Sequence, residues 1–218
     1  MSIAFFDFDK TLIHQNSGSL WVRAELRGGY IGWGMAARAT WWIARYHLGL
    51  SGLDEAVLDA VATLAGQRES DIRARTDRFY DAEVKPLFRP AAILTLQQHR
   101  AAGDRLVLLS TTSNYLAERV GMDLRMDALL CNRFEVDDHG VFTGRPDGPL
   151  CFGDGKLVHA RAYAASLGVP LSETSFYTDS FTDLPVMEAV GRPVAVNPDP
   201  RLRREATRRG WPVVDWGP

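Results

Sequence analysis

The chain has 218 residues, of which 46% are hydrophobic, so it is long enough to bury a sizeable core. Its 25 basic and 27 acidic side chains give a formal net charge of −2, without the overall basic bias that favours nucleic acid. Two cysteines are too few for a disulfide scaffold, and the N-terminal MSIAFFDFDK lacks the features of a secretory signal. We therefore expect a cytoplasmic protein with reduced thiols and no nucleic-acid partner.

The first two segments of the chain differ sharply in character. Residues 3–8 (IAFFDF) are apolar and aromatic apart from Asp7, which predicts a short buried strand. The segment over 31–50 is long and aromatic, but it carries arginines and glycines, so we reject a membrane span. The periodicity of residues 14–85 predicts helices alone, over about 19–27, 33–48, 54–65 and 71–84.

From residue 87 onward, predicted helices alternate with predicted strands. The strands are expected over 105–110, 128–131, 175–178 and 193–197, with an edge strand within 211–216. A small hairpin is expected over 133–145. The helices are expected over 91–101, 113–120, 155–167, 182–190 and 199–209.

This alternation predicts an α/β protein with a doubly wound parallel sheet and helices on both faces. Residues 1–13 and 86–218 would form this core. The helical block 14–85 would be a separate cap inserted after the first strand. In open α/β sheets, ligands bind at the carboxyl ends of the strands, so the residues at those ends are the candidates for function.

Carboxylates gather at two of the predicted strand ends. Asp7 and Asp9 lie at the end of the first strand, and Asp179 follows the strand over 175–178. Three carboxylates in one crevice repel each other by about 4 kcal/mol per pair at 4 Å and an effective dielectric constant near 20. A hard divalent cation would relieve this repulsion, and a site with few carboxylates and room for water favours Mg²⁺.

Groups that suit an anion lie at two further positions. Ser110 and Thr111 follow a strand where a helix is expected to begin, which is a typical anion site. Lys156 lies near a predicted helix start, where the helix dipole does not favour a cation. Each feature alone has an ordinary interpretation, as a turn, a helix cap or a surface lysine. Together they describe a site for phosphoryl transfer.

The order of these residues resembles that of the haloacid dehalogenase superfamily. FFDFDKTL resembles its first motif, LVLLS with Ser110 the second, Lys156 in CFGDGK the third, and YTDSFTDLP with Asp179 and Asp183 the fourth. The inserted helices resemble the cap of the phosphoserine-phosphatase-like branch, subfamily IB, which includes histidinol-phosphatase-like and phosphatidylglycerophosphatase-like proteins. Lys10 departs from the pattern, because relatives often carry a small or neutral residue there.

The resemblance implies a role for each acidic residue. Asp7 would attack phosphorus and form a phosphoaspartyl intermediate. Asp9 would protonate the leaving alcohol and then deprotonate the attacking water. Asp7, the main-chain carbonyl of Asp9, and Asp179 would hold Mg²⁺. The dehalogenases of the superfamily lack the second acid, so the presence of Asp9 favours a phosphate ester over an organic halide as the substrate.

The resemblance also implies supporting roles. Ser110 and Lys156 would bind the phosphate oxygens, with Thr111 beside them. Asp183 would orient Lys156 or a metal-bound water, and Thr11 would brace the Asp9 loop.

The predicted cap is rich in aromatic residues, with four of the six tryptophans of the chain: Trp21, Trp33, Trp41 and Trp42. Three interpretations stay open: a cap core or homodimer contact, a groove for an apolar leaving group, and contact with an anionic membrane surface. His14 could line the site entrance. Arg145, in the hairpin, could reach an acidic group of the substrate, although a solvated arginine is the simpler interpretation.

We predict a Mg²⁺-dependent phosphomonoesterase that acts on a small phosphorylated metabolite. One rival keeps the chemistry and changes the substrate to a phospholipid head group. Another rival is a non-catalytic, receiver-like phosphate-binding domain, which would lack the acid–base function of Asp9. Transfer of the phosphoryl group to an acceptor other than water also stays open.

Overall fold

The computed structural model of the chain describes residues 2–47 and 53–217, without the side chains of residues 42–47 and 53–57. Two compact units make up the protein. The core unit comprises Met1–Gln15, Leu87–Asn132 and Leu150–Pro218, and the helical unit comprises Asn16–Pro86 and Arg133–Pro149. The sequence placed the hairpin in the core, whereas its residues 133–149 group with the helices.

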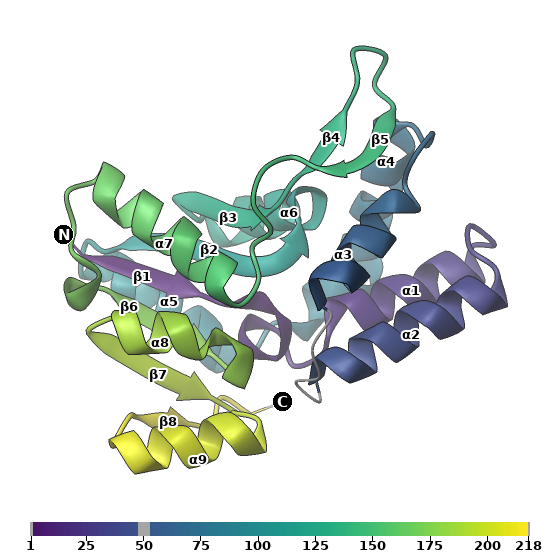
Figure 1. Cartoon of the computed structure of the whole chain (residues 1–218). Coiled ribbons are helices and arrows are strands. Elements are labelled where there is room, and N and C mark those ends of the chain that lie inside the picture. The colour runs from purple at the N-terminus through teal and green to yellow at the C-terminus, as the bar shows by residue number, and fades with distance from the viewer. Residues whose placement is uncertain (1, 48–52, 218) are drawn as a thin grey trace. The chain divides into compact units, whose positions relative to one another are not determined.

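A parallel sheet forms the centre of the core unit (Figure 1). Among the described residues its strands follow the order β3-β2-β1-β6-β7-β8, and each adjacent pair is parallel. The predicted fold class is therefore confirmed. The bounds of these strands are β1 (Ile3–Phe6), β2 (Arg105–Ser113), β3 (Ala128–Asn132), β6 (Ser175–Thr178), β7 (Arg192–Val196) and β8 (Val213–Val214).

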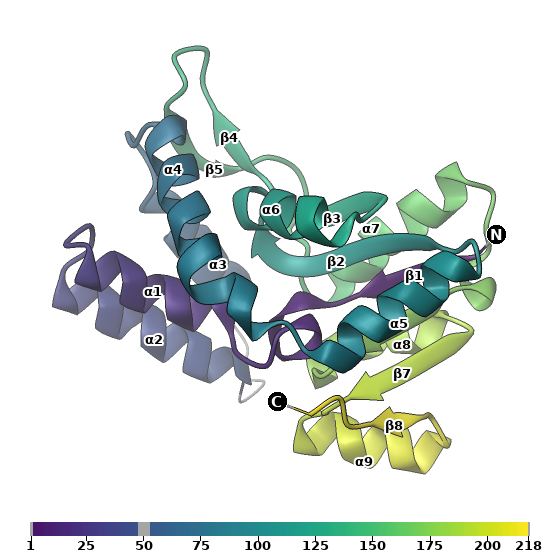
Figure 2. The same ribbon diagram turned by 180° about the vertical axis from the view of Figure 1, so that it is seen from behind.

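Helices cover both faces of this sheet. Figure 1 shows α7 and α8 in front of it, and Figure 2, from behind, shows α5 and α6 over the other face. None of the helices over the described residues is both long and apolar enough to cross a bilayer. The helix bounds are α5 (Pro90–Ala101), α6 (Asn114–Leu124), α7 (Asp154–Ser166), α8 (Leu184–Ala189) and α9 (Pro200–Arg209).

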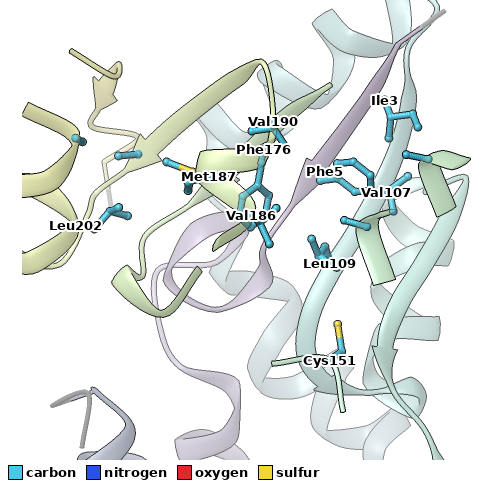
Figure 3. Close-up of a cluster of buried hydrophobic side chains, with 14 residues drawn as sticks. Ile3, Phe5, Val107, Leu109, Cys151, Phe176, Val186, Met187, Val190 and Leu202 are labelled. Carbon is cyan, nitrogen blue, oxygen red and sulfur yellow. The ribbon is translucent and has the colours of Figure 1, made fainter. Parts of the chain in front are cut away.

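Side-chain alternation along the strands builds the larger apolar cluster on one face of the sheet. Ile3 and Phe5 of β1 point to the same side as Val107 and Leu109 of β2, since residues two apart share a face (Figure 3). Helices α7, α8 and α9 supply the residues that cover them. Burying a large apolar side chain contributes about 1.5–3 kcal/mol, so this cluster fixes how the strands lie together.

Local signals set the helix ends, as α9 illustrates. Asp199 precedes the helix, and its Oδ1 accepts hydrogen bonds from the backbone N–H groups of Arg201 at 2.8 Å and Leu202 at 2.9 Å. Pro200 takes the first helical position, where no N–H donor is needed. Gly210 ends the helix with φ of 70°, in the left-handed region that glycine adopts without a steric penalty.

The helical unit contains four α-helices among the described residues, together with the hairpin. Helix α1 lies beside α2, and Trp21 of α1 meets the ring of Phe79 edge to face, with 5.2 Å between the centroids. The side chain of Trp42 lies outside the described residues. The bounds are α1 (Ser17–Arg27), α2 (Trp33–His47), α3 (Leu53–Ala62), α4 (Glu69–Phe79), β4 (Phe134–Val136) and β5 (Phe142–Pro146).

The hairpin packs closely on the helices of its own unit. Gly144 in β5 has φ of 80°, and a Cβ there would lie 2.9 Å from the Cβ of Ala65. The backbone N–H of Phe142 donates to the carbonyl of Gln67 at 2.9 Å, and the N–H of Gly66 donates to the carbonyl of Phe142 at 3.0 Å. These contacts between residues far apart in sequence explain why the hairpin does not belong to the core.

Candidate active site

Asp7 stands at the carboxyl end of the central strand β1. Its backbone N–H donates to the carbonyl of Tyr177 in β6 at 2.9 Å, so pairing with the neighbouring strand continues one residue past Phe6. The chain then leaves the sheet in a tight turn (Phe8–Leu12), within which Lys10 has φ of 56°. The side chain of Asp7 is almost completely buried. A buried carboxylate in this position needs a compensating charge.

Lys156 supplies that charge. Its side chain is 1% exposed, and Nζ donates to Oδ1 of Asp7 at 2.8 Å and to Oδ2 of Asp183 at 2.8 Å. Thr178 at the end of β6 donates its hydroxyl to the same oxygen of Asp183 at 2.6 Å. Asp183 Oδ1 is buried without a hydrogen-bond partner among the described residues. We call Asp7, Lys156, Asp183 and Thr178 the acid–lysine cluster.

The electrostatics of the site are those of crowded, desolvated acids. Burial raises the pKa of Asp7 to about 7, even though Lys156 lowers it, and the charges of Asp183 and Asp9 raise it further. Burial also raises the pKa of Asp179, with a further contribution from the nearby Asp7. Neighbouring carboxylates raise the pKa of Asp7 and of Asp179 because like charges in a low-dielectric site disfavour ionisation.

Asp179 follows β6 directly and is buried. The hydroxyl of Thr11 donates to its Oδ1 at 3.5 Å. The sequence suggested that Thr11 would brace the Asp9 loop, but its described hydrogen bond goes to Asp179. Asp9 is half-buried in the turn after Asp7.

The second strand ends later than the sequence suggested. Strand β2 continues through Ser113, and Ser113 caps helix α6 by accepting a hydrogen bond from the N–H of Leu116 at 3.4 Å. Ser110 is therefore a buried residue within the strand, and Thr111 beside it is half-buried. The predicted strand end at residue 110 is three residues early, and the helix begins at Asn114, one residue after the predicted start, because Ser113 takes the capping position.

Two side chains proposed to meet a substrate have protein partners. Nδ1 of His14 lies 3.1 Å from the carbonyl oxygen of Leu87 in the core unit. Arg145 in the hairpin donates from Nε to Oε2 of Glu135 at 2.7 Å, across the two strands of the hairpin. The arginine is exposed, so its pairing with Glu135 matches the simpler interpretation.

Two buried residues that position the site were not singled out from the sequence. Asn132, at the end of β3, donates from Nδ2 to the carbonyl of Thr111 at 2.6 Å and accepts the N–H of Cys151 at 2.7 Å. It thereby ties the end of β2 to the loop that leads into α7 and Lys156. The signal available in sequence was its position directly after a predicted strand, as for Asp179.

Arg89 is the other residue that the sequence analysis passed over. Its guanidinium donates to the carbonyl of Lys10 at 3.3 Å, and its backbone N–H donates to the carbonyl of Leu12 at 2.9 Å. Burial lowers its pKa, while the charges of Asp215 and Asp179 raise it. Arg89 thus holds the turn that follows Asp7 from two sides.

The donors available to a metal ion are mostly oxygens. Among residues 2–47 and 53–217, no group of three or more His, Cys, Asp or Glu side chains is arranged to hold an ion by itself. Asp7 is close enough to Asp179 for its charge to raise the pKa of Asp179. Two carboxylates, a main-chain oxygen from the turn at Asp9, and water form a donor set that fits Mg²⁺, which keeps several waters in protein sites.

Comparison with known families gives one match over most of the chain. The family model for haloacid dehalogenase-like hydrolases matches residues 4–188, which span β1, the helical unit and the residues of the acid–lysine cluster. The match therefore covers the four motifs that carry Asp7, Ser110, Lys156 and Asp179.

Curated relatives match over nearly the full length of this chain. Phosphoserine phosphatase SerB1 of Mycobacterium tuberculosis is 30% identical over 98% of this chain and 70% of its own. A histidinol-phosphatase of Neisseria meningitidis is 28% identical over 99% of both chains.

Solved structures share the fold. A Bordetella pertussis protein of unknown function is 31% identical, with a TM-score of 0.90 over 99% of both chains. A phosphoserine phosphatase described as a phospho-aspartyl intermediate analogue has a TM-score of 0.74 over 99% of this chain and 93% of its own, at 17% identity.

Proposed function

This chain belongs to the haloacid dehalogenase-like hydrolase family, and we propose that it is a Mg²⁺-dependent phosphatase that hydrolyses a small phosphate monoester through a phosphoaspartyl intermediate. The observation that carries the proposal is the contact of Lys156 with Asp7 at 2.8 Å, deep in the core and at the end of the central strand. A buried lysine paired with a buried acid at this edge of the sheet provides both a nucleophile and a charge to receive a phosphate.

The first half of the reaction is assigned to Asp7 and Asp9. Lys156 holds Oδ1 of Asp7, so we assign the attack on phosphorus to Oδ2. As the new O–P bond forms, the ester O–P bond breaks, and Asp9 donates a proton to the departing alkoxide.

The second half of the reaction releases phosphate. Asp9, now ionised, takes a proton from water as the water oxygen attacks phosphorus. The bond between phosphorus and Asp7 breaks, and inorganic phosphate leaves while both carboxylates return to their starting states. Ser110 and Lys156 are assigned to bind the oxygens of the phosphoryl group in both steps.

The metal-binding residues are assigned as Asp7, Asp179 and the main-chain carbonyl of Asp9. Bound Mg²⁺ supplies positive charge that neutralises the phosphoryl oxygens and keeps the neighbouring acids ionised. Asp183 and Thr178 act on the other side of the site, where they keep Nζ of Lys156 in place.

We also propose that the helical unit acts as a cap that excludes water during the reaction. The relatives named phosphoserine phosphatase and histidinol-phosphatase favour a small, polar phosphate monoester as substrate. The exposed tryptophans of α2 favour a second candidate, a phosphate ester in a lipid head group, since a large apolar surface suits a substrate held in a membrane.

A phosphate-release screen tests the proposal. The substrates are phosphorylated amino acids, amino alcohols, sugars and phospholipids, each with Mg²⁺ and with EDTA, alongside a generic aryl phosphate. We expect release only with the metal, and loss of release in Asp7→Asn. Asp138→Asn, at an exposed turn, is the matched control and should keep full activity. Undiminished turnover in Asp7→Asn would contradict the assignment of the nucleophile.

A further inference from the structure

The outward face of helix α2 is apolar, which reverses the usual pattern of a surface helix. Trp33 is 80% exposed and Trp41 is 62% exposed, and Tyr30, just before the helix, is 54% exposed. Met35 is also exposed. Soluble proteins rarely leave such large aromatic side chains together in water unless the surface contacts another molecule.

Helical geometry places Trp33, Trp41 and Arg38 within one arc of α2, whereas Met35 lies about 160° from Trp33. At about 100° per residue, Trp33 and Trp41 lie about 80° apart around the axis, and Arg38 lies about 60° beyond Trp41. Ala36, which is buried, lies about 140° from Trp41 and about 60° from Trp33, and it marks the side that faces the other helices of its unit. Trp41 and Arg38 therefore lie on the outward face of the helix, with Trp33 at the edge of that face.

The charged side chains of the segment between Glu25 and Asp54 are all positive. No aspartate or glutamate occurs between Glu25 and Asp54, while the same stretch contains Arg27, Arg38 and Arg45. Arg27 pairs with Glu83, which leaves Arg38 as the exposed cation beside the described tryptophans. This helix face is aromatic, is bordered by an arginine and carries no acidic residue. It therefore complements a surface whose outer layer is negatively charged and whose interior is apolar.

We propose that the outward face of α2 docks on the surface of an anionic lipid bilayer. Tryptophan rings enter the boundary between head groups and acyl chains, where their apolar rings are buried and their N–H groups stay hydrated. Arg38 remains at the level of the lipid phosphates. Helix α2 lies in the plane of the interface, since the described helices include none that could cross a bilayer.

A second copy of the chain is the other candidate occupant, and the charges disfavour it. A twofold interface sets the same patch against itself. Arg38 would then approach its own counterpart across a helix that carries no aspartate or glutamate, and two like charges would lose their hydration without a partner on α2. A lipid surface supplies the missing negative charge.

The proposal does not depend on the assigned chemistry, because α2 contributes none of the residues of the acid–lysine cluster. Its test measures binding alone. The full chain is mixed with large unilamellar vesicles of phosphatidylglycerol and phosphatidylcholine, or of phosphatidylcholine alone, and separated by flotation. Tryptophan fluorescence is recorded in parallel, since insertion into the interface shifts the emission to shorter wavelength.

We expect the wild type to float with the anionic vesicles, less so at high salt, and to stay in solution with phosphatidylcholine alone. The double variant Trp33→Ser, Trp41→Ser should lose about tenfold or more in partitioning. Arg38→Glu should weaken binding to anionic vesicles only. Met122→Ser, at an exposed apolar residue of α6 in the core unit, is the matched control and should bind as wild type does.

Circular dichroism and thermal melting show that each variant is folded. The proposal is overturned if wild type stays in solution with anionic vesicles, or if the double variant floats equally well. It is also overturned if light scattering shows a dimer that the double variant dissociates while vesicles bind neither protein, because the face would then join two copies of the chain.

Discussion

Lys156 and Asp183 form a buried ion pair, with 2.8 Å between Nζ and Oδ2, and the lysine shares its charge with Asp7 at the same distance. The ammonium group of Lys156 thereby links the carboxylates of Asp7 and Asp183. The hydroxyl of Thr178 holds Asp183 through a hydrogen bond. The position of Lys156 therefore depends on Asp183 and Thr178, two residues to which we assign no bond-making step.

Asp183→Asn should lower kcat by about tenfold to a hundredfold, because Lys156 loses the charged partner that holds it beside Asp7. Thr178→Val keeps both charges and removes only the hydroxyl that orients Asp183, so its loss should be smaller. Steady-state kinetics on the best substrate of the screen measure both effects. Asp138→Asn serves as the control, and an unchanged kcat in Asp183→Asn would refute the positioning role.

Gly155 permits the close approach of the chain at the start of α7. A Cβ at this position would lie 2.0 Å from the carbonyl oxygen of Leu150, a backbone atom that cannot rotate away. Gly155→Ala should therefore displace the first turn of α7, lower the stability of the protein and reduce turnover through the adjacent Lys156. Gly34→Ala, in α2 with nothing within 4 Å, is the control and should leave thermal stability equal or higher. Equal melting temperatures for Gly155→Ala and wild type would contradict the clash.

The metal-free protein should lose stability as pH rises. Asp7 has a folded-state pKa of about 7 against a reference value of 3.8, so the folded state binds a proton that the unfolded state has already released. The free energy of unfolding therefore falls between about pH 4 and about pH 7, then levels off. Asp179, whose pKa is also raised, contributes in the same direction.

Denaturant titrations in EDTA across this range measure the effect. The slope should be smaller in Asp7→Asn, which has no proton to lose, and added Mg²⁺ should reduce the slope in wild type. Stability of the metal-free wild type that rises over this interval would show that Asp7 is ionised without penalty.

Arg89→Met should lower kcat by about tenfold to a hundredfold with little change in KM, because the turn after Asp7 loses the donor to the carbonyl of Lys10. Arg89→Lys should recover part of the loss, since a lysine retains the charge and one donor. Arg161→Met, at an exposed position of α7, is the control. Equal kinetics for Arg89→Met and wild type, in proteins of equal melting temperature, would remove Arg89 from the positioning residues.

The sequence by itself determined the class of fold and the strand end that carries Asp179, although it ended the second strand three residues early. Apolar strands and capped helices are local patterns, since each depends on residues a few places apart. The proximity of Asp7 and Asp179 could be predicted because the carboxyl ends of parallel strands meet at one edge of a sheet. The chain order of these motifs also carried the resemblance to the family that the later comparison showed.

Only the tertiary structure decided which groups touch. Lys156 and Asp7 are 149 residues apart in sequence, and their contact depends on how α7 packs on the sheet. The hairpin joined the helical unit through Gly144, and Asn132 and Arg89 took positioning roles through buried hydrogen bonds. Such contacts follow from the fit of whole surfaces, in which many weak interactions between distant segments act together, so no local pattern records them.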